Sequence, residues 1–77
     1  MDYGTFNGKT YDNRHGGPFD RGSADNYYGR GVDPHYYVGG TGMSARVAGK
    51  DMTLEEITAY MAGYEWNEQF GDRKNYG

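Results

Sequence analysis

Arginine and aromatic side chains alternate in the middle of the chain, within residues 14–37. Tyrosine rings and guanidinium planes stack on unpaired bases, and arginine also reaches phosphate. The candidate RNA-binding residues are Arg21, Tyr27, Tyr28, Arg30, Tyr36 and Tyr37. The alternative is that the arginines pair with Asp20, Asp25 and Asp33 while the rings fill the core. We favour the alternative, because acids at this density would repel phosphate.

Histidines and carboxylates are also frequent enough to suggest a metal site, since both side chains bind zinc or similar ions. No two histidines stand at a helical i, i+4 spacing, and no calcium loop of alternating Asp and Asn occurs. Aspartates in loops more often cap turns. We therefore expect no metal site among Asp12, His15, Asp20, Asp25, Asp33 and His35.

Catalytic groups are sparse. Ser23 has no partner at a known motif spacing, and Glu65 and Glu68 lie on a polar seam of a predicted helix. The glycine clusters at 16–17 and 39–42 lack the Lys-Ser/Thr and the strand–helix frame of a phosphate loop. We therefore expect that the protein is not an enzyme and that it has no cofactor and no small-molecule substrate.

The composition predicts one small domain over residues 1–77 with a thin core. Leu, Ile, Val and Phe together number only eight, whereas nine Tyr, three Phe and one Trp supply most of the large apolar area. Each aromatic ring buries a large surface with few rotamers to fix. Tyrosine should therefore hold the fold together.

Charge and cysteine content limit the partners and the compartment. The net charge is −3 and the pI is about 5.1, far from the basic footprint of most nucleic-acid-binding domains. There is no cysteine, no apolar run of about 18 residues and no signal-peptide pattern. The sequence predicts a cytoplasmic protein with no membrane partner, in the infected host cell if the protein is viral.

Residues 1–12 predict a β-hairpin. Asn7-Gly8 stands between two β-prone stretches, and both residues tolerate the positive φ of a two-residue turn. This turn pairs Phe6 with Lys9 and Thr5 with Thr10.

Residues 13–50 are rich in Gly and Tyr, and we expect this segment to wrap around the rest of the chain. Within it we expect one short helix over residues 23–28, capped by Ser23 and closed by Gly29. The remainder reads as irregular, with residues 36–38 extended.

A long helix over residues 53–70 is the strongest prediction. Thr53 and Glu56 form a capping box at its start, and Gly71 opens a tail over residues 71–77.

The predicted helix has two apolar stripes, which implies two packing partners. We assign the first stripe to the internal core: Leu54, Ile57, Tyr60, Met61 and Tyr64. The second combines large rings with small residues that admit a partner backbone. We expect it to bind a partner: Ala59, Ala62, Gly63, Trp66 and Phe70.

Several landmarks carry a resemblance to known proteins. The chain resembles small phage-encoded proteins without a settled role and is more distantly similar to bacterial ribosome modulation factor. The matching landmarks are Arg21-Gly22, Gly29-Arg30, Pro34 with Tyr36, and Tyr60 through Tyr64. The resemblance implies two helices joined by a linker and binding to the small ribosomal subunit, which promotes inactive ribosome dimers. That family is strongly basic, whereas this chain is acidic.

Together these observations predict an α+β, mainly α domain that acts by interaction. The predicted partner is a host protein or a second copy of the chain in a homodimer. The alternative is a ribosome- or RNA-binding modulator, and a third possibility is a structural part of a virion.

Overall fold

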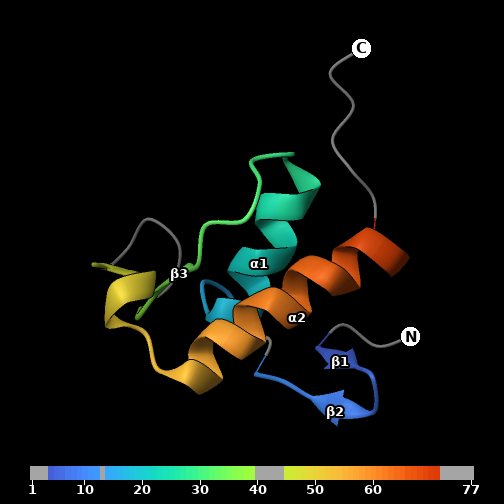
Figure 1. Cartoon of the computed structure of the whole chain (residues 1–77), viewed down its shortest axis with the longest axis horizontal. Coiled ribbons are helices and arrows are strands. Elements are labelled where there is room, and N and C mark those ends of the chain that lie inside the picture. Colours follow the sequence, from blue (N-terminus) through green and yellow to red (C-terminus); the bar gives the residue numbers. More distant parts are fainter. Residues whose placement is uncertain (1–3, 13, 40–44, 72–77) are drawn as a thin grey trace.

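A computed structural model describes residues 4–12, 14–39 and 45–71. Two helices cross at its centre, with one small β-ribbon on either side (Figure 1). The fold is therefore α+β and mainly α, as predicted. Its elements in chain order are β1 (Thr5–Phe6), β2 (Lys9–Thr10), α1 (Pro18–Tyr27), β3 (His35–Tyr37), β4 (Arg46–Ala48), the 3-10 turn η1 (Gly49–Asp51) and α2 (Leu54–Phe70).

Helix α2 confirms the strongest sequence prediction. The Thr53 hydroxyl accepts the backbone N–H of Glu56 at 3.1 Å, and the Glu56 carboxylate accepts the N–H of Thr53 at 2.8 Å. This capping box satisfies two amides that a helix start leaves unpaired. The helix ends at Phe70, and among the described residues no helix is long and apolar enough to cross a membrane. The predicted tail lies outside the described residues beyond Gly71.

Helix α1 begins five residues earlier than predicted. Gly17 is its N-cap and Pro18 opens it, so the Gly-Pro pair that reads as a helix breaker is a helix start. Proline suits this position, because the missing N–H would have no partner in the first turn. Ser23 is buried inside α1 rather than capping it.

The end of α1 was predicted correctly. Gly29 has a φ of +69°, its N–H donates to the Asn26 carbonyl, and the N–H of Arg30 donates to the Asp25 carbonyl at 2.9 Å. These two bonds form a Schellman motif, which needs a left-handed residue at this point.

The N-terminal hairpin has the predicted register. Thr5 pairs with Thr10 and Phe6 with Lys9. Asn7 and Gly8 turn the chain with φ values of +53° and +78°. Positive φ at both central residues is the geometry that favours Asn-Gly.

The second ribbon was missed by the sequence analysis. Residues 36–38 were expected to be extended, but the antiparallel pairing of β3 with β4 was not predicted. Its register sets Tyr36 opposite Val47. The N–H of Tyr37 also donates to the Gly16 carbonyl at 2.7 Å, which ties β3 to the start of α1.

The helices cross through two glycines in a reciprocal contact. A Cβ added to Gly22 would lie 1.9 Å from the Tyr60 carbonyl oxygen, and one added to Gly63 would lie 2.0 Å from the Phe19 carbonyl oxygen. Phe19 and Tyr60 are both fully buried, three residues before their glycine. The two backbones therefore touch, with one aromatic ring buried on each side.

The division of α2 into a core stripe and a partner stripe is wrong. Of the predicted core stripe only Tyr60 is buried, and Leu54 is 79% exposed. In the predicted partner stripe, Ala62 joins the apolar core with Phe6 and Phe19, while Tyr11 and Trp66 pack against this cluster. The hairpin and α1 thus cover the side that we had assigned to a partner.

Candidate functional site

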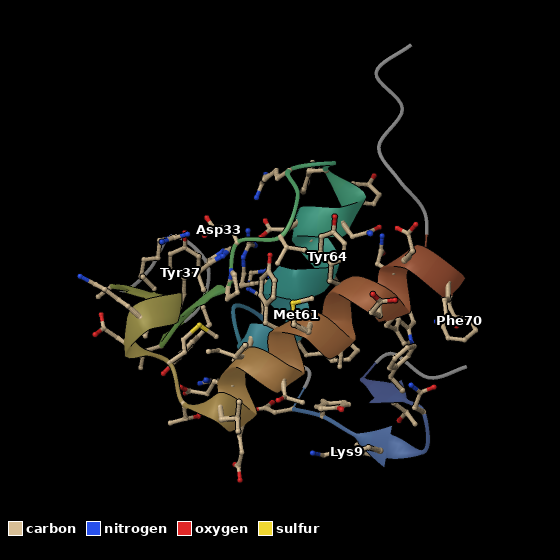
Figure 2. All side chains as sticks on the ribbon, in the orientation of Figure 1. Lys9, Asp33, Tyr37, Met61, Tyr64 and Phe70 are labelled. Atoms are coloured by element: carbon tan, nitrogen blue, oxygen red, sulfur yellow. The ribbon has the colours of Figure 1, made fainter. Side chains whose placement is uncertain are left out.

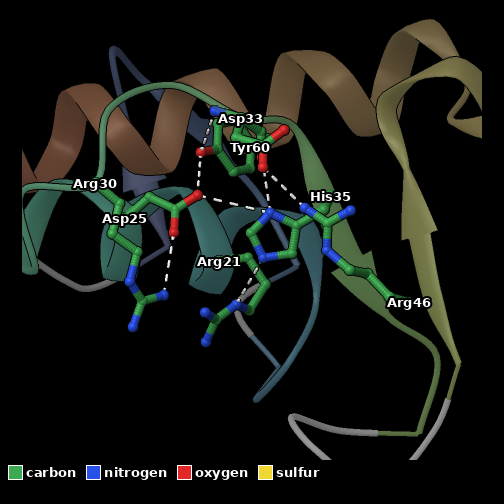
Figure 3. Close-up of polar contacts among 7 residues, drawn as sticks. All are labelled: Arg21, Asp25, Arg30, Asp33, His35, Arg46 and Tyr60. Carbon is green, nitrogen blue, oxygen red and sulfur yellow. Dashed lines mark hydrogen bonds and ion pairs between the residues drawn. The ribbon is translucent and has the colours of Figure 1, made fainter.

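A buried carboxylate joins the two helices to the loop between them. Asp25 on α1 is 2% exposed and accepts a short hydrogen bond from the Tyr60 hydroxyl of α2. The Arg30 guanidinium lies 3.3 Å from its other oxygen (Figure 3). Burial, and next the bond to Asp25, raise the pKa of Tyr60 well above its ordinary value of 10.0. The hydroxyl therefore stays protonated and donates to Asp25.

His35 on β3 completes this network. Its Nδ1 lies 2.7 Å from the Asp33 carbonyl oxygen and 3.6 Å from Asp25 Oδ2, while Arg21 Nε donates to Nε2 at 3.2 Å. A carbonyl only accepts and a guanidinium only donates, so these partners assign the neutral ring with its proton on Nδ1. The Asp33 N–H donates to the Tyr60 hydroxyl at 3.0 Å. Each hydrogen bond in the network therefore has an assigned donor and acceptor.

A second polar cluster lies further along the two helices. The Asn67 amide donates to Asn26 at 2.7 Å, and the Asn26 amide donates to Glu68 at 2.6 Å. Asn26 and Asn67 are both nearly fully buried. Side-chain amides thus replace apolar packing over this part of the crossing.

The candidate RNA-binding residues form two arginine–tyrosine stacks. The Arg21 guanidinium lies 5.6 Å from the ring centre of Tyr37, and that of Arg30 lies 4.6 Å from the ring centre of Tyr28. Both guanidinium groups point away from α2 (Figure 3). The Tyr27 ring meets Tyr28 edge-on at 4.9 Å.

Tyr36, the remaining candidate, bonds to Glu56 on α2. This bond, more than burial, raises the pKa of the Tyr36 hydroxyl. Tyr36 thus faces Glu56 rather than either of the two arginine–tyrosine stacks.

Carboxylates already pair with three of the arginines. Arg14 contacts Asp12 at 3.5 Å, and Arg46 contacts Asp33 at 2.9 Å. Arg30 contacts the buried Asp25. Of these pairs, Arg30 with Asp25 is one that the alternative predicts, whereas Asp33 pairs with Arg46 from outside the arginine–aromatic segment and Asp20 accepts the Gly16 N–H at 2.9 Å. In the part of the chain that the structure describes, no group of three or more His, Asp or Glu side chains is placed to hold a metal ion.

The predicted partner stripe is divided into a covered centre and two open ends. Ala62 and Gly63 are buried, the latter against the Phe19 carbonyl. Trp66 is half-buried and its ring centre lies 6.4 Å from that of Phe19. Phe70 is 47% exposed and points outward at the far end of α2 (Figure 2).

Two residues that support this surface, Tyr11 and Phe19, were not among the predicted site residues. Tyr11 stacks on Phe19 at 5.7 Å, Phe19 meets Trp66, and Trp66 meets Phe70 at 6.1 Å. One series of rings thus runs from the hairpin through the core to the surface. The only sequence signal was the scarcity of aliphatic residues, which made aromatic packing necessary.

At the other open end, Ala59 lies on the wall of a pocket. The pocket has a volume of about 460 Å³ and lies between the hairpin, the start of α1 and the first turns of α2. Its remaining lining residues are Lys9, Thr10, Tyr11, Asp12, Arg14, Pro18, Glu55 and Glu56.

Comparison with protein-family models, curated protein sequences and solved structures gives no match for this chain. The functional inference therefore depends on the surfaces described above.

Proposed function

We propose that this chain is a non-enzymatic interaction protein that binds a partner protein through the exposed aromatic end of α2. The observation that carries the proposal is Phe70, a large apolar side chain 47% exposed beside the half-buried Trp66. In keeping with the resemblance to phage-encoded proteins, the partner is a bacterial host protein in the cytoplasm of the infected cell.

Phe70 is suited to anchor a partner because neighbouring aromatic rings hold it in place. Its ring contacts Trp66, which in turn contacts the fully buried Phe19. An aromatic group that is held in place before binding loses little conformational entropy in a complex. Aromatic anchors of this kind carry much of the energy of protein interfaces.

The surroundings of Phe70 favour a basic partner surface. Glu65 and Gln69 are exposed on the same end of α2. The helix C-terminus adds the partial negative charge of the helix dipole. The matching surface is an apolar pocket with Lys or Arg at its rim, since complementary charges steer association.

The test compares Phe70→Ala with Leu54→Ala, which truncates the other exposed apolar side chain of α2. Tagged proteins are incubated with nuclease-treated bacterial lysate, and captured proteins are quantified by mass spectrometry and then purified for titration. We expect to capture one host protein. Its affinity for the chain should fall at least about tenfold with Phe70→Ala, or about 1.4 kcal/mol, and should be unchanged with Leu54→Ala. Equal binding by the two variants would refute it. Sedimentation of the purified chain separates this outcome from self-association, which needs no lysate.

A second candidate function is binding to ribosomal or other single-stranded RNA. The specific observation in its favour is the pair of stacks, Arg21 with Tyr37 and Arg30 with Tyr28. Affinity for RNA should fall steeply between about 0.05 and 0.2 M salt, whereas capture through Phe70 should change little. Tyr28→Ala should weaken the RNA complex and leave the protein complex intact.

A further inference from the structure

The pocket between the hairpin and α2 has the volume of a small-ligand site and a lining rich in charge. Its volume of about 460 Å³ falls within the usual range for such sites. Apolar surface comes from Tyr11, Pro18 and Ala59, which are contributed by three different segments of the chain. Charged side chains of both signs complete the lining.

Three of the five charged lining residues are already engaged within the fold. Arg14 contacts Asp12 and also donates to the Val38 carbonyl at 3.1 Å. The Glu56 carboxylate accepts the Thr53 N–H in the capping box. A ligand that recruited these groups would have to break existing contacts.

The two other charges, Lys9 and Glu55, remain available for a ligand. Lys9 is exposed, and its ammonium lies 5.0 Å from the ring centre of Tyr11. Glu55 is also exposed, and its carboxylate makes no hydrogen bond or ion pair with the other described residues. The pocket thus presents one cation from β2 and one anion from α2 (Figure 2 shows Lys9).

We propose that this pocket binds a short zwitterionic peptide. The peptide carboxylate pairs with Lys9, its ammonium pairs with Glu55, and an apolar side chain lies on Tyr11 and Ala59. The proposal concerns binding without reaction and goes beyond the proposed function, since the pocket and Phe70 lie at opposite ends of α2.

The probe is glycyl-phenylalanyl-glycine with free termini, titrated into the isotope-labelled full chain and followed by the amide resonances of Thr10, Tyr11 and Ala59. Acetylating the amine or amidating the carboxylate should each weaken binding about fivefold, which is the upper range for an exposed ion pair. Lys9→Met and Glu55→Gln should have the same effect. The matched controls Lys50→Met and Glu65→Gln change exposed charges outside the pocket and should have none.

The exchange variant Lys9→Glu/Glu55→Lys provides the sharpest test. It keeps one charge of each sign in the pocket, so the free peptide should still bind, in the reverse direction. Equal binding of free and doubly capped peptides would overturn the proposal. None of these outcomes depends on Phe70.

Discussion

Replacing Gly63 by alanine tests the contact that determines how the two helices pack. In an ordinary helix interior this change stabilises by about 1 kcal/mol, because alanine has the higher helix propensity. Here the new methyl group would lie 2.0 Å from the Phe19 carbonyl oxygen. The obstacle is backbone, so it cannot be relieved by a change of rotamer.

The expected magnitude follows from the balance of these two effects. The helices must separate by about 1 Å or more, and overpacking of this kind costs up to about 3 kcal/mol. Subtracting the gain in propensity leaves a net loss of about 2 kcal/mol. The free energy of unfolding of a domain of this size is about 4–12 kcal/mol, and the melting temperature should fall by about 8–16 °C.

Thermal and urea unfolding followed by far-UV circular dichroism measures this loss. Thr58→Ala, at an exposed position of α2, is the matched control and should stabilise slightly. Gly22→Ala should resemble Gly63→Ala, and the double variant should lose less than the sum, because one separation of the helices relieves both clashes. The close crossing is refuted if Gly63→Ala is as stable as the parent chain.

Two predictions concern pH. Because burial and then the bond to Asp25 raise the pKa of Tyr60, stability should be complete below pH 10 and fall as the pH rises above it, by up to about 1.4 kcal/mol per pH unit. Urea titrations of Tyr60→Phe should show a smaller alkaline decline, and identical slopes would contradict the role of this hydroxyl. The backbone of Thr53 and then the Tyr36 hydroxyl lower the pKa of Glu56, so the stability that it contributes is present above pH 4.5 and is lost as the pH falls. Glu56→Ala should therefore be less stable than the parent at neutral pH and equally stable in acid. If the difference in free energy of unfolding persists near pH 3, the charged carboxylate is not its cause.

Features determined by neighbouring residues could be read from the sequence. The Asn7-Gly8 turn has the hairpin register that its type requires. The Thr53 capping box and the Gly29 turn that closes α1 lie where local hydrogen bonding places them. In each case the partners are within six residues of one another.

Features determined by distant residues could not be read in this way. The start of α1 at Pro18 was missed because Gly-Pro fits both a loop and a helix start. The pairing of β3 with β4 joins segments separated by a Gly-rich stretch that is longer than the two-residue turn from which a register can be read.

The candidate surface was misjudged for the same reason. Periodicity identified two apolar stripes on α2 but not which neighbours would cover them. Gly63 was assigned to a partner backbone, and it does contact a backbone, that of α1 in the same chain. Of the five predicted partner residues, the structure leaves Phe70 the most exposed.

The burial of Asp25 has a consequence for how the chain folds. Its hydrogen-bonding and charged partners are Arg30 just after α1, His35 on β3 and Tyr60 on α2, and Tyr60 is the one that lies far from Asp25 in the sequence. A partly assembled chain would hold a desolvated carboxylate with too few donors. We therefore expect partly folded states that bury Asp25 without Tyr60 to be disfavoured. In a chain with so few aliphatic residues, one buried acid thus links the correct placement of α2 to that of α1.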